Sequence, residues 1–107
     1  EKTRQYFKVE VMGNINGDVV CQGNIECNDI NGDVKECRGN ISAGGDINGE
    51  VNCGNNVACG NNISGNVSCG NNVTCRKNIE GDADCGGRVE CREIKGNVEC
   101  QGDIIYK

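Results

Sequence analysis

Apolar residues recur along this chain in three sets, each repeating at intervals of 15 to 17 residues, with Gly, Asn and Asp between them. The first set is Ile15, Ile30, Ile47, Ile63, Ile79 and Ile94; the second is Val19, Val34, Val51, Val67, Ala83 and Val98; the third is Ile25, Ile41, Val57, Val73, Val89 and Ile104. A fixed period of this length is typical of a solenoid, in which each repeat is one coil that buries its apolar side by stacking on its neighbours.

The local pattern indicates short strands joined by tight corners. In each Val-x-Cys triplet the Val and the Cys are two residues apart, so they point to the same side of an extended strand. The Gly-Asn-Asn segments supply residues that tolerate the positive φ of a tight corner. Three strands and three corners per coil predict an all-β fold, a single-stranded parallel β-helix of about six coils of about 16 residues, as one domain over residues 1–107. With strands about 4.8 Å apart, the rod would be roughly 29 Å long.

The sequence also predicts a separate strand at the N-terminal end and one irregular coil. Residues 5–12 alternate Phe7, Val9 and Val11, which predicts a leading strand before the coils of residues 13–107, with Tyr6 or Phe7 covering one end of the rod. The segment 34–37 holds one residue more than the other triplets, which predicts a β-bulge that keeps the cysteines in register.

Ten cysteines follow the same period. One column is Cys21, Cys37, Cys53, Cys69, Cys85 and Cys100; the other is Cys27, Cys59, Cys75 and Cys91, with Ala43 in its empty slot. Neighbours in such a column lie about 4.8 Å apart, whereas the Cβ atoms of a disulfide lie about 3.8 Å apart, so a general disulfide framework is disfavoured. The Ala43 slot favours cysteine as a small inward-facing hydrophobe, which implies reduced thiols and a cytoplasmic setting.

Binding of zinc, cadmium or copper(I) by the thiol columns stays open as an alternative. The Cys-x5-Cys spacing, the absence of Cys-x2-Cys pairs and the absence of His speak against it, so no metal or other cofactor is assigned. A catalytic thiol is weaker still, because no His stands near a cysteine to lower its pKa.

Composition excludes several functions. The net charge is −5 and the basic residues are scattered, which gives no positive stripe for nucleic acid. No apolar run is long enough to cross a membrane, and no signal peptide is visible; the first residue, Glu1, suggests a fragment or a processed chain. No coil carries an insertion that could house a substrate, and His is absent, so the chain is not expected to be an enzyme and has no catalytic residues.

Acidic and amide residues form further columns. The column Asp18, Asp33, Glu50, Asn66, Asp82 and Asn97 is interpreted as a solvated acidic edge, with calcium binding as the minor alternative. The residues Asn24, Asn40, Asn56, Asn62, Asn72 and Asn78 are expected to stack at equivalent corners and to hydrogen-bond along the rod.

The phrase Ile-x-Gly-Asp-Val, as in Ile15–Val19 and Ile30–Val34 and in four later copies, resembles the β-helical core of the bactofilins over roughly residues 13–104. Bactofilins are polymer-forming cytoskeletal proteins of bacteria. The resemblance implies a right-handed helix without an enzymatic site that assembles through its ends. The cysteine columns depart from the aliphatic core of that family.

The sequence therefore predicts a structural rod, either a rigid spacer or a scaffold that associates end to end. Each end of a β-helix exposes unpaired strand edges, which invite stacking unless they are capped. The expected contacts are Tyr6, Phe7, Val9, Ile104, Ile105 and Tyr106. A thiol-rich or soft-metal module and a protein-binding module along a flat side remain the alternatives.

Overall fold

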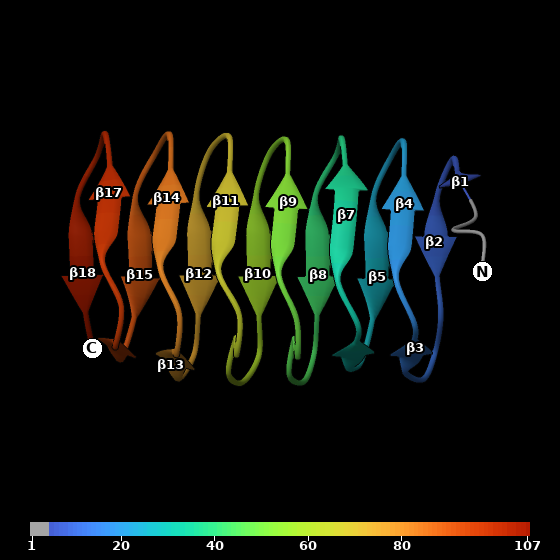
Figure 1. Cartoon of the computed structure of the whole chain (residues 1–107), viewed down its shortest axis with the longest axis horizontal. Helices are drawn as coiled ribbons and strands as arrows, with labels where there is room; N and C mark the ends of the chain where they lie inside the picture. Colours follow the sequence, from blue (N-terminus) through green and yellow to red (C-terminus); the bar gives the residue numbers. More distant parts are fainter. Residues whose placement is uncertain (1–4) are drawn as a thin grey trace.

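In a computed structural model, which describes residues 5–107 and only the backbone of residues 5 and 6, the chain is a parallel β-helix (Figure 1). Two faces of the rod are seven-stranded parallel sheets over these residues. The first sheet contains β1 (Gln5–Tyr6), β4 (Val19–Cys21), β7 (Val34–Cys37), β9 (Val51–Cys53), β11 (Val67–Cys69), β14 (Ala83–Cys85) and β17 (Val98–Cys100). The second contains β2 (Val9–Glu10), β5 (Ile25–Cys27), β8 (Ile41–Ala43), β10 (Val57–Cys59), β12 (Val73–Cys75), β15 (Val89–Cys91) and β18 (Ile104–Tyr106).

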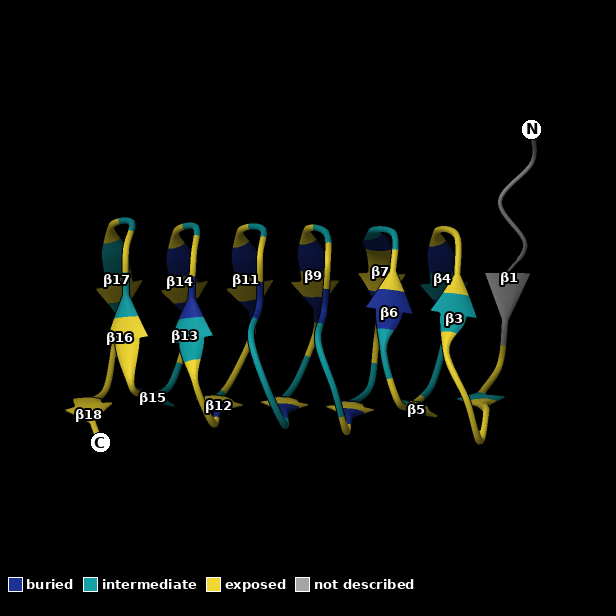
Figure 2. Cartoon of the chain, turned by 90° about the horizontal axis from the view of Figure 1, so that it is seen from below, coloured by how far each residue is buried: buried dark blue, intermediate teal, exposed yellow. Residues whose placement is uncertain are grey.

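The third face contains fewer and shorter strands than the other two. Its strand pairs are β3 (Ile15–Asn16) with β6 (Ile30–Asn31) and β13 (Asn78–Ile79) with β16 (Glu93–Ile94) (Figure 2). Single bridges from Ile30 to Ile47, from Ile47 to Ile63 and from Ile63 to Ile79 connect the two pairs. The predicted β-helix with a period of about 16 residues is thus confirmed, and its Cα atoms extend over 35 × 22 × 21 Å.

The core is made of the predicted apolar columns. In a strand such as Val57–Cys59 the first and third residues are buried and the middle one is exposed. The register is in line from coil to coil, so that Val57 pairs with Ile41 on one side and with Val73 on the other. In the inner coils, inward positions therefore lie between similar side chains of the coils above and below, and among the side chains described no polar or charged residue is buried.

Glycine serves a different purpose from the one predicted. Within residues 5–107, a positive φ occurs only at Gly17, so the corners do not depend on left-handed backbone. A Cβ atom on Gly49 would instead overlap the carbonyl oxygen of Gly32 one coil earlier, and a Cβ on Gly65 would overlap that of Gly49. Glycine is required because successive coils approach each other through the backbone at this corner.

Asn and Asp side chains connect the coils at the corners. The Oδ1 atom of Asn40 accepts the backbone N–H of Asn56 at 3.2 Å, and that of Asn56 accepts the N–H of Asn72 at 3.1 Å. The predicted ladder is therefore present, but it runs from side chain to backbone. The acidic column takes part as well, since Asp33 Oδ1 accepts the N–H of Glu50 at 2.9 Å. An Oδ1 atom serves equally well on an amide or a carboxylate, which explains why Asn and Asp alternate.

Two local expectations had different outcomes. The register between β4 and β7 shifts after Val19, which confirms the bulge in residues 34–37, and Cys21 still pairs with Cys37. The leading segment 5–12 is not one strand: β1 lies in the first sheet and β2 in the second, with a corner between them. The segment follows the rule of the other coils, because each strand has only two to four residues before the chain turns to the next face.

Candidate functional site

The C-terminal end of the rod exposes residues of the core columns. Ile104 and Tyr106 of β18 pair with Val89 and Cys91 of β15. Val89 is fully buried, whereas Ile104 is 42% and Tyr106 57% exposed, and Ile105 is exposed beside them. The sequence placed all three residues at an end, and the structure agrees. Ile104 and Tyr106 occupy inward positions that no further described coil covers, whereas Ile105 is the middle residue of its strand, a position that faces outward in the neighbouring strands.

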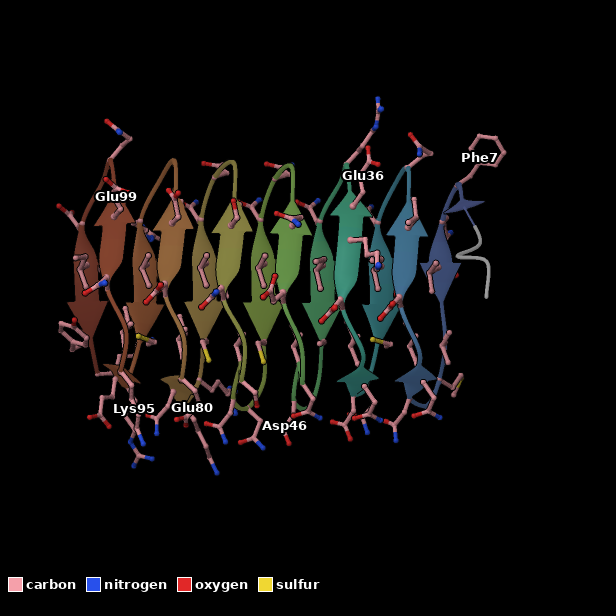
Figure 3. The ribbon with its side chains drawn as sticks, in the orientation of Figure 1. Phe7, Glu36, Asp46, Glu80, Lys95 and Glu99 are labelled. Atoms are coloured by element: carbon pink, nitrogen blue, oxygen red, sulfur yellow. The ribbon has the colours of Figure 1, made fainter. Side chains whose placement is uncertain are left out.

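The N-terminal end is hollow. A depression of about 410 Å³ is lined by polar and charged residues and by apolar ones in similar measure: Lys8, Glu10, Asn14, Asn16 and Asp18, and Val9, Val11, Ile15 and Val19. Val9 packs against the core, as expected of an end residue. Phe7 is 89% exposed and points away from the rod (Figure 3), so it does not cover the end as predicted. The side chain of Tyr6 lies outside the described part of the chain, but its backbone pairs with Cys21.

Sequence reasoning missed two exposed apolar residues at this end, Val11 and Met12. The repeat could have revealed Val11. Val9 pairs with Ile25, and Cys27 lies two residues after Ile25, so Val11, two residues after Val9, occupies the same column as Cys27. Met12 projects into solvent, and no periodic position predicts it.

All ten cysteines are free thiols, and eight of them are buried. In the first sheet the six cysteines are direct register partners from coil to coil, from Cys21 to Cys100. In the second sheet Cys59 pairs with Cys75, and Ala43 lies between Cys27 and Cys59. The sequence interpretation of cysteine as an inward-facing core residue is confirmed.

Several thiols donate to carbonyl groups of the corners. Cys53 Sγ lies 3.1 Å from Gly39 O of the preceding coil and 3.3 Å from Asn56 O of its own turn. Cys59 repeats this arrangement with Gly45 O at 3.2 Å and Asn62 O at 3.4 Å. The thiol therefore binds two turns together while its apolar part fills the core.

Burial sets the acidity of most thiols. Desolvation, reinforced by the charge of Asp29, raises the pKa of Cys27 to about 11, and desolvation raises the pKa of Cys69 to about 12. In the neighbouring pair Cys37 and Cys53, the Cys37 thiol can donate to a Cys53 thiolate, so the pKa of Cys53 is lowered and that of Cys37 is raised.

Other chemistry has little support in the described residues. No three Cys, Asp or Glu side chains gather into a possible metal site there, which leaves tetrahedral zinc and calcium cages without a ligand set. Over residues 5–107, no helix has the length and apolar character to cross a membrane.

Comparisons of the chain with protein-family models, with curated proteins and with solved structures found no match.

Proposed function

We propose that this chain is a non-enzymatic structural rod that stacks end to end with further copies of itself. The observation that carries the proposal is that, within the part of the chain that the structure describes, core columns end uncovered at both ends: Ile104 and Tyr106 are exposed at one end, and Val9, Val11 and Ile15 line a hollow at the other. A second copy supplies the same columns at the same spacing. The resemblance of the Ile-x-Gly-Asp-Val repeats to the end-assembling bactofilins points in the same direction.

The sheet edges suit such a stack. The outer strands of the first sheet are β1 and β17, and those of the second sheet are β2 and β18. All strands within each sheet are parallel. A copy displaced along the rod axis therefore presents β1 to β17 and β2 to β18 in parallel orientation, and the unpaired backbone groups of these edges can bond to each other.

Continuing the register of the second sheet pairs Val9 of one copy with Ile104 of the other, because both belong to the column of Ile25 and Val89. The same register brings the basic Lys8 beside the acidic Asp103. It also places Tyr106 next to Val11, at the hollow end. Apolar contact and opposite charge thus favour the same alignment.

Light scattering after size-exclusion chromatography, over a range of concentrations and with reductant, tests the proposal. We expect the mass to rise with concentration and negative-stain images to show stacks in one line. The double variant Ile104→Lys, Tyr106→Lys should remain a monomer, because it places cations against the apolar side chains Val9 and Val11, which the alignment pairs with these two positions. The control Ser42→Lys, Thr74→Lys adds the same charge on exposed positions of the rod side and should assemble as wild type does.

A charge exchange tests the alignment itself. Asp103→Lys should weaken assembly by placing two lysines together, and the double variant Lys8→Glu, Asp103→Lys should restore it. A protein that is monomeric at every concentration contradicts the proposed function. Unchanged assembly of the Ile104→Lys, Tyr106→Lys variant shows that the ends are not the interface.

A further inference from the structure

One corner of the rod, between the second sheet and the third face, forms a continuous row of residues from coil to coil. Near its start the N–H of Asp46 donates to Asp29 Oδ1 at 2.8 Å. Further along, the N–H of Lys77 donates to Asn61 O at 3.2 Å, and that of Arg92 donates to Lys77 O at 2.8 Å. We call this corner the charged ridge; it consists of Asp29, Asp46, Asn61, Asn62, Arg76, Lys77, Arg92 and Glu93.

The charge of the ridge changes sign along the rod. On the coils of β5 and β8 the ridge has two acidic residues and no basic residue, a net charge of −2. On the coils of β12 and β15 it has three basic residues and one acidic residue, a net charge of +2. The coil of β10 between them contributes only Gly60, Asn61 and Asn62. Because β10 is the fourth of the seven strands of the second sheet, the sign changes at the middle of the rod.

The charges of the ridge are available to a partner. Its three basic residues are exposed, and among the side chains described the ridge takes part in no ion pair. Each ridge aspartate uses Oδ1 as an acceptor within the rod, and its carboxylate retains a second oxygen. Asp46 lies on the same edge in Figure 3 as Glu80 and Lys95 of the third face, and the latter two pair with each other at 3.4 Å.

We propose that two rods pair side by side in antiparallel orientation through the charged ridge, so that the partner is a second copy of this chain. With a two-fold axis at Asn61, the coil of β8 in one copy faces the coil of β12 in the other. Asp46 then faces Arg76 and Lys77, and Asp29 faces Arg92. The two-fold axis generates every contact twice.

Other partners fit the ridge less well. A polyanion along the corner would be attracted by the basic half and repelled by the acidic half, and a polycation would meet the opposite problem. Two parallel copies would place like charges against each other. A partner must therefore reverse its charge over the same length, and an antiparallel copy does so because its coils have the same spacing.

The pairing of two single rods should be weak. A corner is narrow and buries much less than the roughly 800 Å² per partner of a standard interface. Exposed ion pairs contribute little and are screened by salt. In end-to-end stacks, and here the inference rests on the proposed function, the ridge recurs in every copy with its sign change at mid-rod. Two antiparallel stacks then pair along their whole length, and the weak contacts act together.

Analytical ultracentrifugation of the reduced double variant Ile104→Lys, Tyr106→Lys isolates side-by-side pairing, because this variant should not stack. We expect a dimer at about 0.01 M salt, where the Debye length is about 30 Å, and a monomer at about 0.15 M salt, where it is about 8 Å. In the wild type at the higher salt, negative-stain images should show stacks that are two rods wide. A monomer at both salt concentrations would overturn the proposal.

A matched pair of substitutions in that variant tests the ridge. Asp29→Asn, Asp46→Asn removes the negative charge and keeps both Oδ1 acceptors, so the fold should be preserved. The control Asp33→Asn, Asp82→Asn makes the same change at two acceptors of another corner. Because the net charge changes equally, only the ridge variant should lose the dimer. Equal loss in both variants, or a dimer retained in the ridge variant, would overturn the proposal.

Carbodiimide coupling of mixed unlabelled and isotope-labelled chains tests the orientation. The reagent condenses a carboxylate with an amine to an amide and takes up the water that is released. Mass spectrometry should find Asp46 of one chain linked to Lys77 of a chain with the other label, and the absence of this mixed link would overturn the antiparallel alignment. Wild-type stacks one rod wide would contradict side-by-side pairing alone. Dimers of the double variant, together with a wild type that never stacks, would contradict the proposed function alone.

Discussion

Replacing Asn62 by Ala removes one rung of a corner ladder, and replacing Asn78 by Ala provides a control at the equivalent position of the next coil. Asn62 Oδ1 accepts the backbone N–H of Asn78 at 3.0 Å, and the N–H of Asn62 is itself accepted by Asp46 Oδ1 at 3.0 Å. Asn78 Oδ1 is buried and has no hydrogen-bond partner. The two residues thus have the same side chain and similar burial but differ in one hydrogen bond.

The magnitude follows from that bond. A hydrogen bond contributes about 1 kcal/mol to stability, and a buried N–H left without an acceptor costs about 1–3 kcal/mol. The corner is only half buried, so water can partly replace the lost oxygen. We expect Asn62→Ala to lower the free energy of unfolding by about 1–2 kcal/mol. Asn78→Ala removes an oxygen that is already unsatisfied and should change stability little. Asn62→Asp keeps the accepting Oδ1, as Asp46 does one coil earlier, and should resemble wild type.

Urea denaturation followed by far-UV circular dichroism, with reductant present, measures these differences as shifts of the midpoint at constant slope. Low protein concentration keeps assembly from contributing to the apparent stability. An equal loss in Asn62→Ala and Asn78→Ala would refute the role of the Oδ1 bond. So would a loss in Asn62→Asp as large as that in Asn62→Ala, because the carboxylate still offers an acceptor.

Three further predictions concern glycine, the core and alkaline pH. Gly49→Ala should lower the free energy of unfolding by about 1–3 kcal/mol in the same urea assay, because its Cβ would overlap the Gly32 carbonyl oxygen. The control Gly13→Ala has no atom near the added Cβ and should be neutral or slightly stabilising. Ile63→Ala should lower the free energy of unfolding by about 2–5 kcal/mol, because Ile63 is fully buried between Ile47 and Ile79. The control Ile94→Ala, in the half-buried last coil, should lower it clearly less. Equal losses of stability in the two variants would contradict the stacked core. In metal-free, reduced protein the raised pKa values of Cys27, about 11, and Cys69, about 12, lie above the ordinary value of 9.0. Their contribution to stability is complete below about pH 9 and is lost as the pH rises through 11 and 12, so the melting temperature should fall over that range; a constant melting temperature would contradict it.

The sequence was sufficient to predict the coils because the side-chain pattern and the hydrogen bonding repeat with the same period. Each column keeps one kind of residue, and a slip by one position would turn Val and Cys outward together, so register follows from the pattern alone. The corner glycines were misinterpreted for a physical reason. Their constraint comes from the carbonyl of the preceding coil, which is 15 to 17 residues away in the chain and cannot be seen in local turn preferences.

The ends could be predicted only in part. The columns of Val9 and Ile104 indicate where the core stops being covered, and the structure places both residues at the ends. Phe7 was assigned by alternation with Val9 and Val11, but a corner lies between Phe7 and Val9. Alternation holds only within one strand, and strands of two or three residues are too short for it to extend across a corner.

In the second sheet, the positions of the cysteine column that lack cysteine follow a shortened turn one coil earlier. Cys37, Cys53, Cys59 and Cys75 each follow a full-length turn one coil earlier and donate to a carbonyl of that turn, as Cys53 does to Gly39 O and Cys59 to Gly45 O. The turns from Cys27 to Ile30 and from Cys91 to Ile94 are one residue shorter. The positions one coil after them in the same column are Ala43 and Tyr106, the two places where that column lacks cysteine after its first thiol. A shortened turn lacks the middle residue whose carbonyl, as in Gly39 and Gly45, accepts the thiol of the next coil, while its last carbonyl, Asp29 O, accepts the N–H of Ile15 at 2.9 Å as Asn40 O accepts that of Ile25. Cysteine in this rod is therefore a small core side chain that at four positions also donates a hydrogen bond to the preceding coil, and the gaps in the thiol column of the second sheet fall one coil after the shortened turns.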